Sequence, residues 1–123
     1  GKDELKPDMK PQLRRVAELL KRRPEVTLRV DGHTDNVPIH TERFHSNWEL
    51  ASARALAVIH FLIDECDVPQ ERLSAASFGE SRPLASNDNE EDRERNRRVE
   101  FRFMQQTEET AYENSPEDEL VTE

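Results

Sequence analysis

The sequence predicts an α+β domain, a two-layer sandwich in which helices pack on a small mixed β-sheet. Helical and strand-like periodicities follow one another in the order helix, strand, helix, strand, strand. The longer helix separates two strands, as a crossover between parallel neighbours does. The last strand is expected to pair in an antiparallel or mixed arrangement. Three strands make a thin sheet, so we expect a further strand upstream of Gly1.

The first helix and the strand after it are predicted from two different periods. Between residues 8 and 23, apolar side chains recur every three or four positions on one helix face, with Asp8 as the expected N-cap and Pro24 as the stop. That face consists of Met9, Leu13, Val16 and Leu20. Residues 26–31 alternate between apolar and polar, which indicates a strand with one buried face. A polar loop, 33–46, follows.

A longer helix is predicted from residue 46 to Cys66, with Ser46 or Asn47 as its N-cap. Its apolar stripe consists of Leu50, Ala53, Leu56, Ala57, Ile59, Phe61, Leu62 and Ile63. The segments that follow are a turn at 67–72, a strand at 73–78, a polar loop with a helical turn near 90–95, and a strand at 99–103.

Composition divides the 123 residues into a domain at 1–104 and an acidic, disordered tail at 105–123. The formal net charge is −9, but the tail holds seven acidic residues and no basic one. The domain is therefore nearly balanced in charge, which disfavours nucleic acid as a partner. No apolar run approaches the roughly 20 residues of a membrane helix, and no signal peptide is recognised in this sequence.

Polar side chains that a sheet does not need gather after the first strand. Loops at strand ends commonly hold binding sites, although the same residues also suit a turn capped by its own side chains. Asn47 and Arg54 lie two helical turns apart, on a face that we expect to look toward this loop. Arg54 would pair there with Asp35 or hold a ligand carboxylate, unless it is a solvated surface residue. Residues 96–98 add donors near the same end, or form a solvated strand edge. The candidate binding residues are Thr34, Asp35, Asn36, Asn47, Arg54 and Arg97.

No residue pattern typical of a catalytic or metal site is present. The four histidines lack the spacing of zinc ligands, and there is no glycine-rich phosphate loop. No G-x-S-x-G turn presents a serine, and Cys66 has no basic neighbour to activate its thiol. Spacing alone leaves open a general base formed by His33 and Asp35. We expect no metal, no cofactor and no enzymatic activity.

Three segments together resemble the peptidoglycan-binding domain shared by outer-membrane protein A, the peptidoglycan-associated lipoprotein and the flagellar motor B subunit. They are VDGHTDN at 30–36, SNWELASARA at 46–55 and NRRVE at 96–100. Their order and spacing are specific, and the resemblance covers about residues 3 to 104. GHTDNVPI at 32–39 and SNWEL at 46–50 are most similar to the motor B branch. The acidic tail has no counterpart.

The resemblance implies an OmpA-C-like fold of βαβαββ type that binds the peptide stem of peptidoglycan without catalysis. In that family an Asp and an Arg hold diaminopimelate; here these are Asp35 and Arg54, supported by Asn47 and Arg97. The motor branch further implies a periplasmic homodimer whose full-length protein is anchored in the inner membrane by an N-terminal helix, beside a stator partner subunit. Two alternatives are a wall-anchoring domain of an outer-membrane protein or lipoprotein, and a cell-wall hydrolase.

Overall fold

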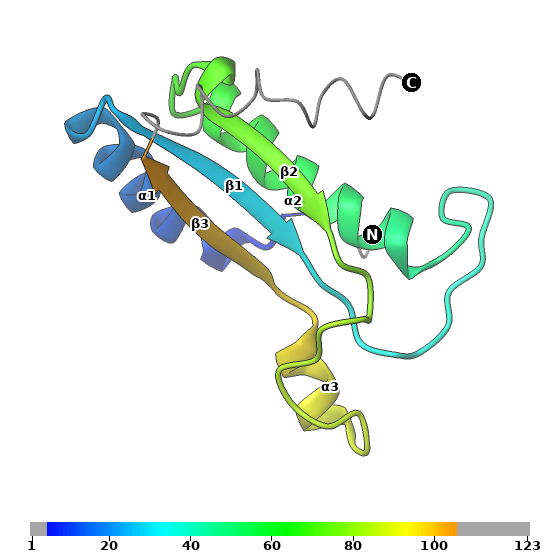
Figure 1. Cartoon of the computed structure of the whole chain (residues 1–123). Helices are drawn as coiled ribbons and strands as arrows, with labels where there is room; N and C mark the ends of the chain where they lie inside the picture. The colour runs from blue at the N-terminus through cyan, green and yellow to red at the C-terminus, as the bar shows by residue number, and fades with distance from the viewer. Residues whose placement is uncertain (1–4, 106–123) are drawn as a thin grey trace, which may run out of the picture.

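One mixed sheet of three strands organises the computed structural model, which describes residues 5–105. The central strand is β1 (Val26–Gly32), which pairs parallel with β2 (Leu73–Ser77) and antiparallel with β3 (Val99–Gln105) (Figure 1). The predicted parallel crossover is confirmed, and the last strand is antiparallel, but its partner is β1 and not the preceding strand β2. Beyond Gln105, the predicted tail lies outside the described residues.

Two helices cover a single face of the sheet, so the molecule has two layers. They are α1 (Lys10–Arg22) and α2 (Asn47–Asp64), and both lie behind the sheet in Figure 1. The helices cover the apolar face of the sheet, because Val26, Leu28 and Val30 alternate with polar residues along β1 and are almost fully buried. The core consists of Leu13, Ala17, Leu20, Val26, Leu28, Val30, Ala55, Val58, Ile59, Phe61, Leu62, Cys66 and Val68.

The short α3 (Glu90–Asn96) lies beyond the end of the sheet where β1 and β2 finish and β3 begins (Figure 1). It confirms the helical turn predicted near residues 90–95. Two 3₁₀ turns, η1 (Pro7–Met9) and η2 (Gln70–Arg72), precede α1 and β2. Within residues 5–105, no helix has the length and apolarity needed to cross a membrane.

The two long helices begin in different ways. Ser46 caps α2 as predicted, because its hydroxyl accepts a hydrogen bond from the Trp48 backbone N–H at 3.2 Å. The prediction that Asp8 caps the first helix was wrong. Asp8 lies inside η1, and Met9 precedes α1 without a side-chain cap. Pro11 stands in the first turn of α1, where the backbone N–H that proline lacks would have had no helical partner.

Gly32 lets the end of β1 approach α2 closely. A Cβ atom on Gly32 would lie 2.0 Å from the carbonyl oxygen of Ala51, well inside van der Waals contact. The obstacle is backbone and cannot swing aside. The loop that carries the candidate binding residues starts directly after this contact, so the contact fixes where that loop leaves the sheet.

We expect Gly32→Ala to lower the free energy of unfolding by about 3 kcal/mol or more, because strand and helix must move apart. Gly79→Ala is the comparison. Gly79 has φ +53°, and its added Cβ would meet the Trp48 side chain at 3.3 Å, so we expect a loss of about 1 kcal/mol. Urea denaturation of both variants checks this order. Equal losses, or none at Gly32, would contradict the close-approach argument.

Candidate functional site

A cavity of about 540 Å³ lies among the loop after β1, residues 47–58 of α2, the segment before α1 and the residues around α3. Its apolar lining consists of Leu5, Met9, Val37, Ile39, Leu50 and Val58. Its polar and charged lining consists of Lys6, Thr34, Asp35, Asn47, Arg54, Glu90, Arg97 and Arg98. The structure therefore brings five of the six candidate residues together. The sixth, Asn36, is exposed, and its backbone N–H donates to the Asn87 side chain at 3.3 Å.

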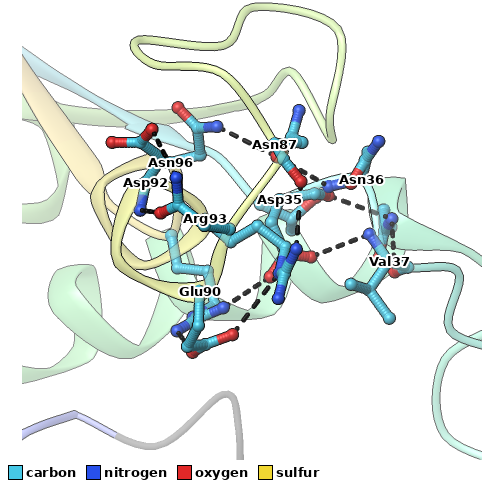
Figure 2. A network of polar contacts seen from close by, with 12 residues as sticks. Asp35, Asn36, Val37, Asn87, Glu90, Asp92, Arg93 and Asn96 are labelled. Carbon is cyan, nitrogen blue, oxygen red and sulfur yellow. Dashed lines mark hydrogen bonds and ion pairs between the residues drawn. The ribbon is translucent and has the colours of Figure 1, made fainter.

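Asp35 is the buried carboxylate of this cavity, with only 8% of its surface exposed. Its Oδ1 accepts a hydrogen bond from the Val37 backbone N–H at 3.0 Å (Figure 2). Its Oδ2 accepts one from Arg97 Nη1 at 2.6 Å. Thr34 donates its hydroxyl to the Asp35 carbonyl at 2.8 Å. The self-capped turn and the charged site, which were alternatives in the sequence, therefore occur together.

Arg97 links two carboxylates. Besides Asp35, it donates from Nη2 to Glu90 Oε2 at 2.6 Å. Burial alone would lower the pKa of Arg97, but the hydrogen bonds to Asp35 and Glu90 outweigh burial and raise it. The same contact lowers the pKa of Glu90. The sequence predicted Arg97 as a donor near this end of the sheet and, through the family resemblance, as a supporting binding residue, whereas the structure makes it a direct ion-pair partner of Asp35.

Asn47 and Arg54 hold α2 against the loop, on the shared face expected from their spacing. The buried amide of Asn47 donates to the carbonyls of Asp35 at 3.3 Å and Val37 at 3.1 Å. Arg54 Nη1 donates to the carbonyl of His33 at 3.2 Å. Both side chains also line the cavity, so each combines a bond that positions the loop with access to a ligand.

A second polar network, built around the fully buried Asn96, fixes the loop between β2 and α3 (Figure 2). Asn96 Oδ1 accepts from the backbone N–H groups of Leu84 at 2.7 Å and Ala85 at 2.9 Å. Its amide nitrogen donates to Asn87 Oδ1 at 3.0 Å, the same oxygen that accepts from the Asn36 backbone. This network connects α3 to the Asp35 loop and thereby sets the position of Arg97.

Several residues of the site were not predicted from the sequence. Glu90 stands seven residues before Arg97, a spacing that places residues on one side of a helix, and this was the available signal. The contributions of Lys6 and Met9 had no signal, because they depend on how the segment before α1 packs. Within residues 5–105, no three His, Cys, Asp or Glu side chains are grouped so as to hold a metal ion.

Comparisons with known proteins agree with this architecture. Residues 1–97 match the model of the OmpA family. The chain is 37% identical over 104 residues to Motility protein B of Bacillus subtilis, an alignment that covers 85% of this chain and 40% of that protein. The chain thus spans less than half the length of this relative.

Several solved structures are similar to this one. The C-terminal domain of Helicobacter pylori MotB superposes with a TM-score of 0.78 at 35% identity, covering 95% of this chain and 89% of that chain. The cell wall anchor of the type VI secretion system of Pseudomonas aeruginosa gives a TM-score of 0.69 at 36% identity, covering 82% and 68% of the two chains. The predicted OmpA-C-like fold is confirmed.

His33 lies outside the residues that line the cavity, although it precedes Thr34 in the chain. Its ring is 2% exposed and stacks on Phe78 with centroids 5.2 Å apart. Neither ring nitrogen has a hydrogen-bond partner among the described residues, and Nε2 is 3.7 Å from Glu100. The structure therefore does not bring His33 and Asp35 together in the cavity as a general base.

Burial is the main cause that lowers the pKa of His33. The positive charge of Arg98 lowers it further, with a smaller contribution from Arg82, whereas Glu100 and Asp31 act in the opposite direction. The folded protein thus holds this imidazole neutral to a lower pH than the unfolded chain does.

We therefore expect the free energy of unfolding to fall as the pH is lowered from 7 to 5. The unfolded chain takes up the His33 proton near pH 6.5, before the folded state does, so this stability is complete above that pH and lost below it. Denaturant titrations at several pH values measure the effect. His33→Phe keeps a ring against Phe78 and should flatten the dependence; parallel curves for variant and wild type would contradict this origin. The pKa values of Glu90 and Glu100 are lowered in the folded protein, so their contributions to the free energy of unfolding are lost only at more acidic pH.

Proposed function

Because the chain belongs to the OmpA family, we propose that it binds cell-wall peptidoglycan without catalysis and anchors a larger protein to the wall. The observation that carries this proposal is a convergence. The three segments that resemble peptidoglycan-binding domains, at 30–36, 46–55 and 96–100, meet at one cavity that holds a buried carboxylate and several guanidinium groups. Segments so far apart in the chain meet there because β3 returns beside β1.

The chemistry of the cavity suits the diaminopimelate residue of the peptide stem. This residue ends in an ammonium and a carboxylate on the same carbon, carried on a short methylene chain. Asp35 accepts hydrogen bonds from the Val37 backbone and from Arg97, and as a carboxylate with about four acceptor positions it suits an ammonium. Arg54 offers a planar guanidinium to the carboxylate. Leu50 and Val58 supply an apolar wall for the methylene chain.

The expected affinity of one site is modest. Each charge-assisted hydrogen bond contributes about 1.5–3 kcal/mol, from which the ordering of the ligand must be subtracted. A few such bonds correspond to a dissociation constant of about 1 μM or weaker. An anchor needs no more than this, because the wall repeats its stem peptides and several tethered domains engage it together.

For the full-length protein, we propose a flagellar motor stator subunit, with this domain in the periplasm as part of a dimer and an inner-membrane anchor supplied elsewhere in the chain. The support comes from the SNWEL segment at 46–50 and from the likeness to MotB of Bacillus subtilis and Helicobacter pylori. The fold is also shared by a cell wall anchor of a secretion system. The motor assignment therefore rests on sequence, whereas wall binding rests on the site.

The test is co-sedimentation of the domain with insoluble peptidoglycan sacculi. We expect the wild type to pellet, and Asp35→Asn and Arg54→Ala to lower the apparent affinity about tenfold or more, since each removes a charge-assisted contact. Asp64→Asn and Arg15→Ala make the same charge changes at exposed positions outside the cavity, and they should bind like the wild type. Circular dichroism verifies that every variant is folded.

Each result has a distinct meaning. A wild type that stays in the supernatant would contradict wall binding. Wild-type affinity in both cavity variants would mean that the ligand binds outside this cavity. Soluble muropeptides released during incubation would favour the cell-wall hydrolase.

A further inference from the structure

We propose that Glu90 is a built-in competitor for the ligand: in the free domain its carboxylate occupies the position on Arg97 that a carboxylate of the peptide stem takes on binding. This inference rests on the proposed function and adds to it a residue that sets the affinity of the site. In Figure 2, Glu90 extends from the first turn of α3 toward the Asp35 loop.

The contact between Glu90 and Arg97 has the geometry of a ligand contact. Arg97 Nη2 donates to Glu90 Oε2 at 2.6 Å, while Nη1 of the same guanidinium donates to Asp35 at 2.6 Å. All three side chains line the cavity. A guanidinium recognises a carboxylate through these in-plane N–H groups. With Glu90 in place, the outer half of Arg97 is therefore already occupied by a carboxylate.

The two carboxylates on Arg97 differ in how firmly they are held. The Asp35 side chain is 11% exposed, and its second oxygen is bound by the Val37 backbone, so it stays in place. The Glu90 side chain is 68% exposed, and ion pairs that face solvent are weak. An incoming carboxylate thus displaces Glu90 and leaves Asp35.

A second cation lies close to Glu90 and is available to it after it leaves Arg97. Its Oε1 lies 3.4 Å from Nε of Arg93, one helical turn along α3. The charge of Glu90 therefore remains compensated after Arg97 has been given up, which lowers the cost of the exchange. When Glu90 is displaced from Arg97, it exchanges one ion-pair partner for another within residues 90–97. The sheet need not rearrange.

The charges around the cavity indicate which ligand group competes. Four cationic side chains line it, Lys6, Arg54, Arg97 and Arg98, against two acidic ones, Asp35 and Glu90. Neutralising Glu90 leaves Asp35 as the single acidic group among the described lining residues. The cavity then attracts anions more strongly and keeps the carboxylate that suits an ammonium.

The experiment compares Glu90→Gln with Glu91→Gln in sedimentation isotherms on sacculi at fixed ionic strength. Glutamine keeps the size of the side chain and removes the charge that holds Arg97. Glu91 is exposed on the same helix and does not line the cavity, so its variant controls for the net charge of the domain against an anionic wall. We expect Glu90→Gln to bind about two- to fivefold more tightly than the wild type, and Glu91→Gln to bind equally to it.

The outcomes separate this inference from the proposed function. A wild type that pellets while Glu90→Gln binds no more tightly than Glu91→Gln would overturn the inference alone. Weaker binding of Glu90→Gln would also overturn it, because Glu90 would then hold the ligand directly. If neither the wild type nor Glu90→Gln pellets, both proposals are overturned. Thermal unfolding verifies that the two variants are equally folded.

Discussion

The ion pair between Asp35 and Arg97 is the interaction on which the site depends. It joins a residue in the loop after β1 to one that lies two positions before β3, at 2.6 Å and largely out of water, although the two are 62 positions apart in the chain. Taking two charges out of water is costly, and the attraction between them offsets that cost only when the remaining acceptors and donors are also satisfied. The Val37 backbone and Glu90 supply those partners. The pair is thus held by its surroundings rather than by its own attraction alone.

The topology of the sheet explains why this pair exists. Parallel β1 and β2 end at the same edge, and antiparallel β3 begins there. Backbone hydrogen bonds join the three chain segments that leave or enter the sheet at that edge. The Thr34 N–H donates to the Gly79 carbonyl at 2.8 Å, and the His33 N–H donates to the Arg98 carbonyl at 2.9 Å. Because these bonds lie directly beside the cavity, the sheet fixes the positions of the charged side chains, and the site requires no ligand to assemble it.

Sequence reasoning predicted the parts of the molecule that local periodicity controls. The strand at 26–31 and the helix capped by Ser46 follow from alternation and capping chemistry, and both are confirmed. Asp8 was assigned wrongly because prolines, rather than a side-chain cap, shape the start of α1. The cavity residues Asp35 and Asn47 were found because motif and helical spacing place them.

The remaining contacts of the site depend on the irregular loop between β2 and α3. That loop has no period to interpret, and its course is decided by the buried amide of Asn96, whose bonds reach back to Leu84, Ala85 and Asn87. A single asparagine in a charged segment gives no sequence signal of such a role. The pairing of Glu90 with Arg97 follows from the same loop, since the loop determines where α3 stands relative to the sheet.

A zwitterionic ligand suits a site in which the charges of Asp35 and Arg97 are already paired with each other. If an ammonium alone approached Asp35, or a carboxylate alone approached Arg97, the cavity would be left with an uncompensated charge in a partly dry environment, which is costly. A group carrying both charges adds them in balance. Exchange of Glu90 for a ligand carboxylate preserves that balance at Arg97 while the displaced side chain keeps Arg93. Under the proposed function, the internal ion pairs would hold the site ready for a zwitterion and reduce its affinity for it, and a weak, reversible contact repeated along a polymer is what an anchor requires.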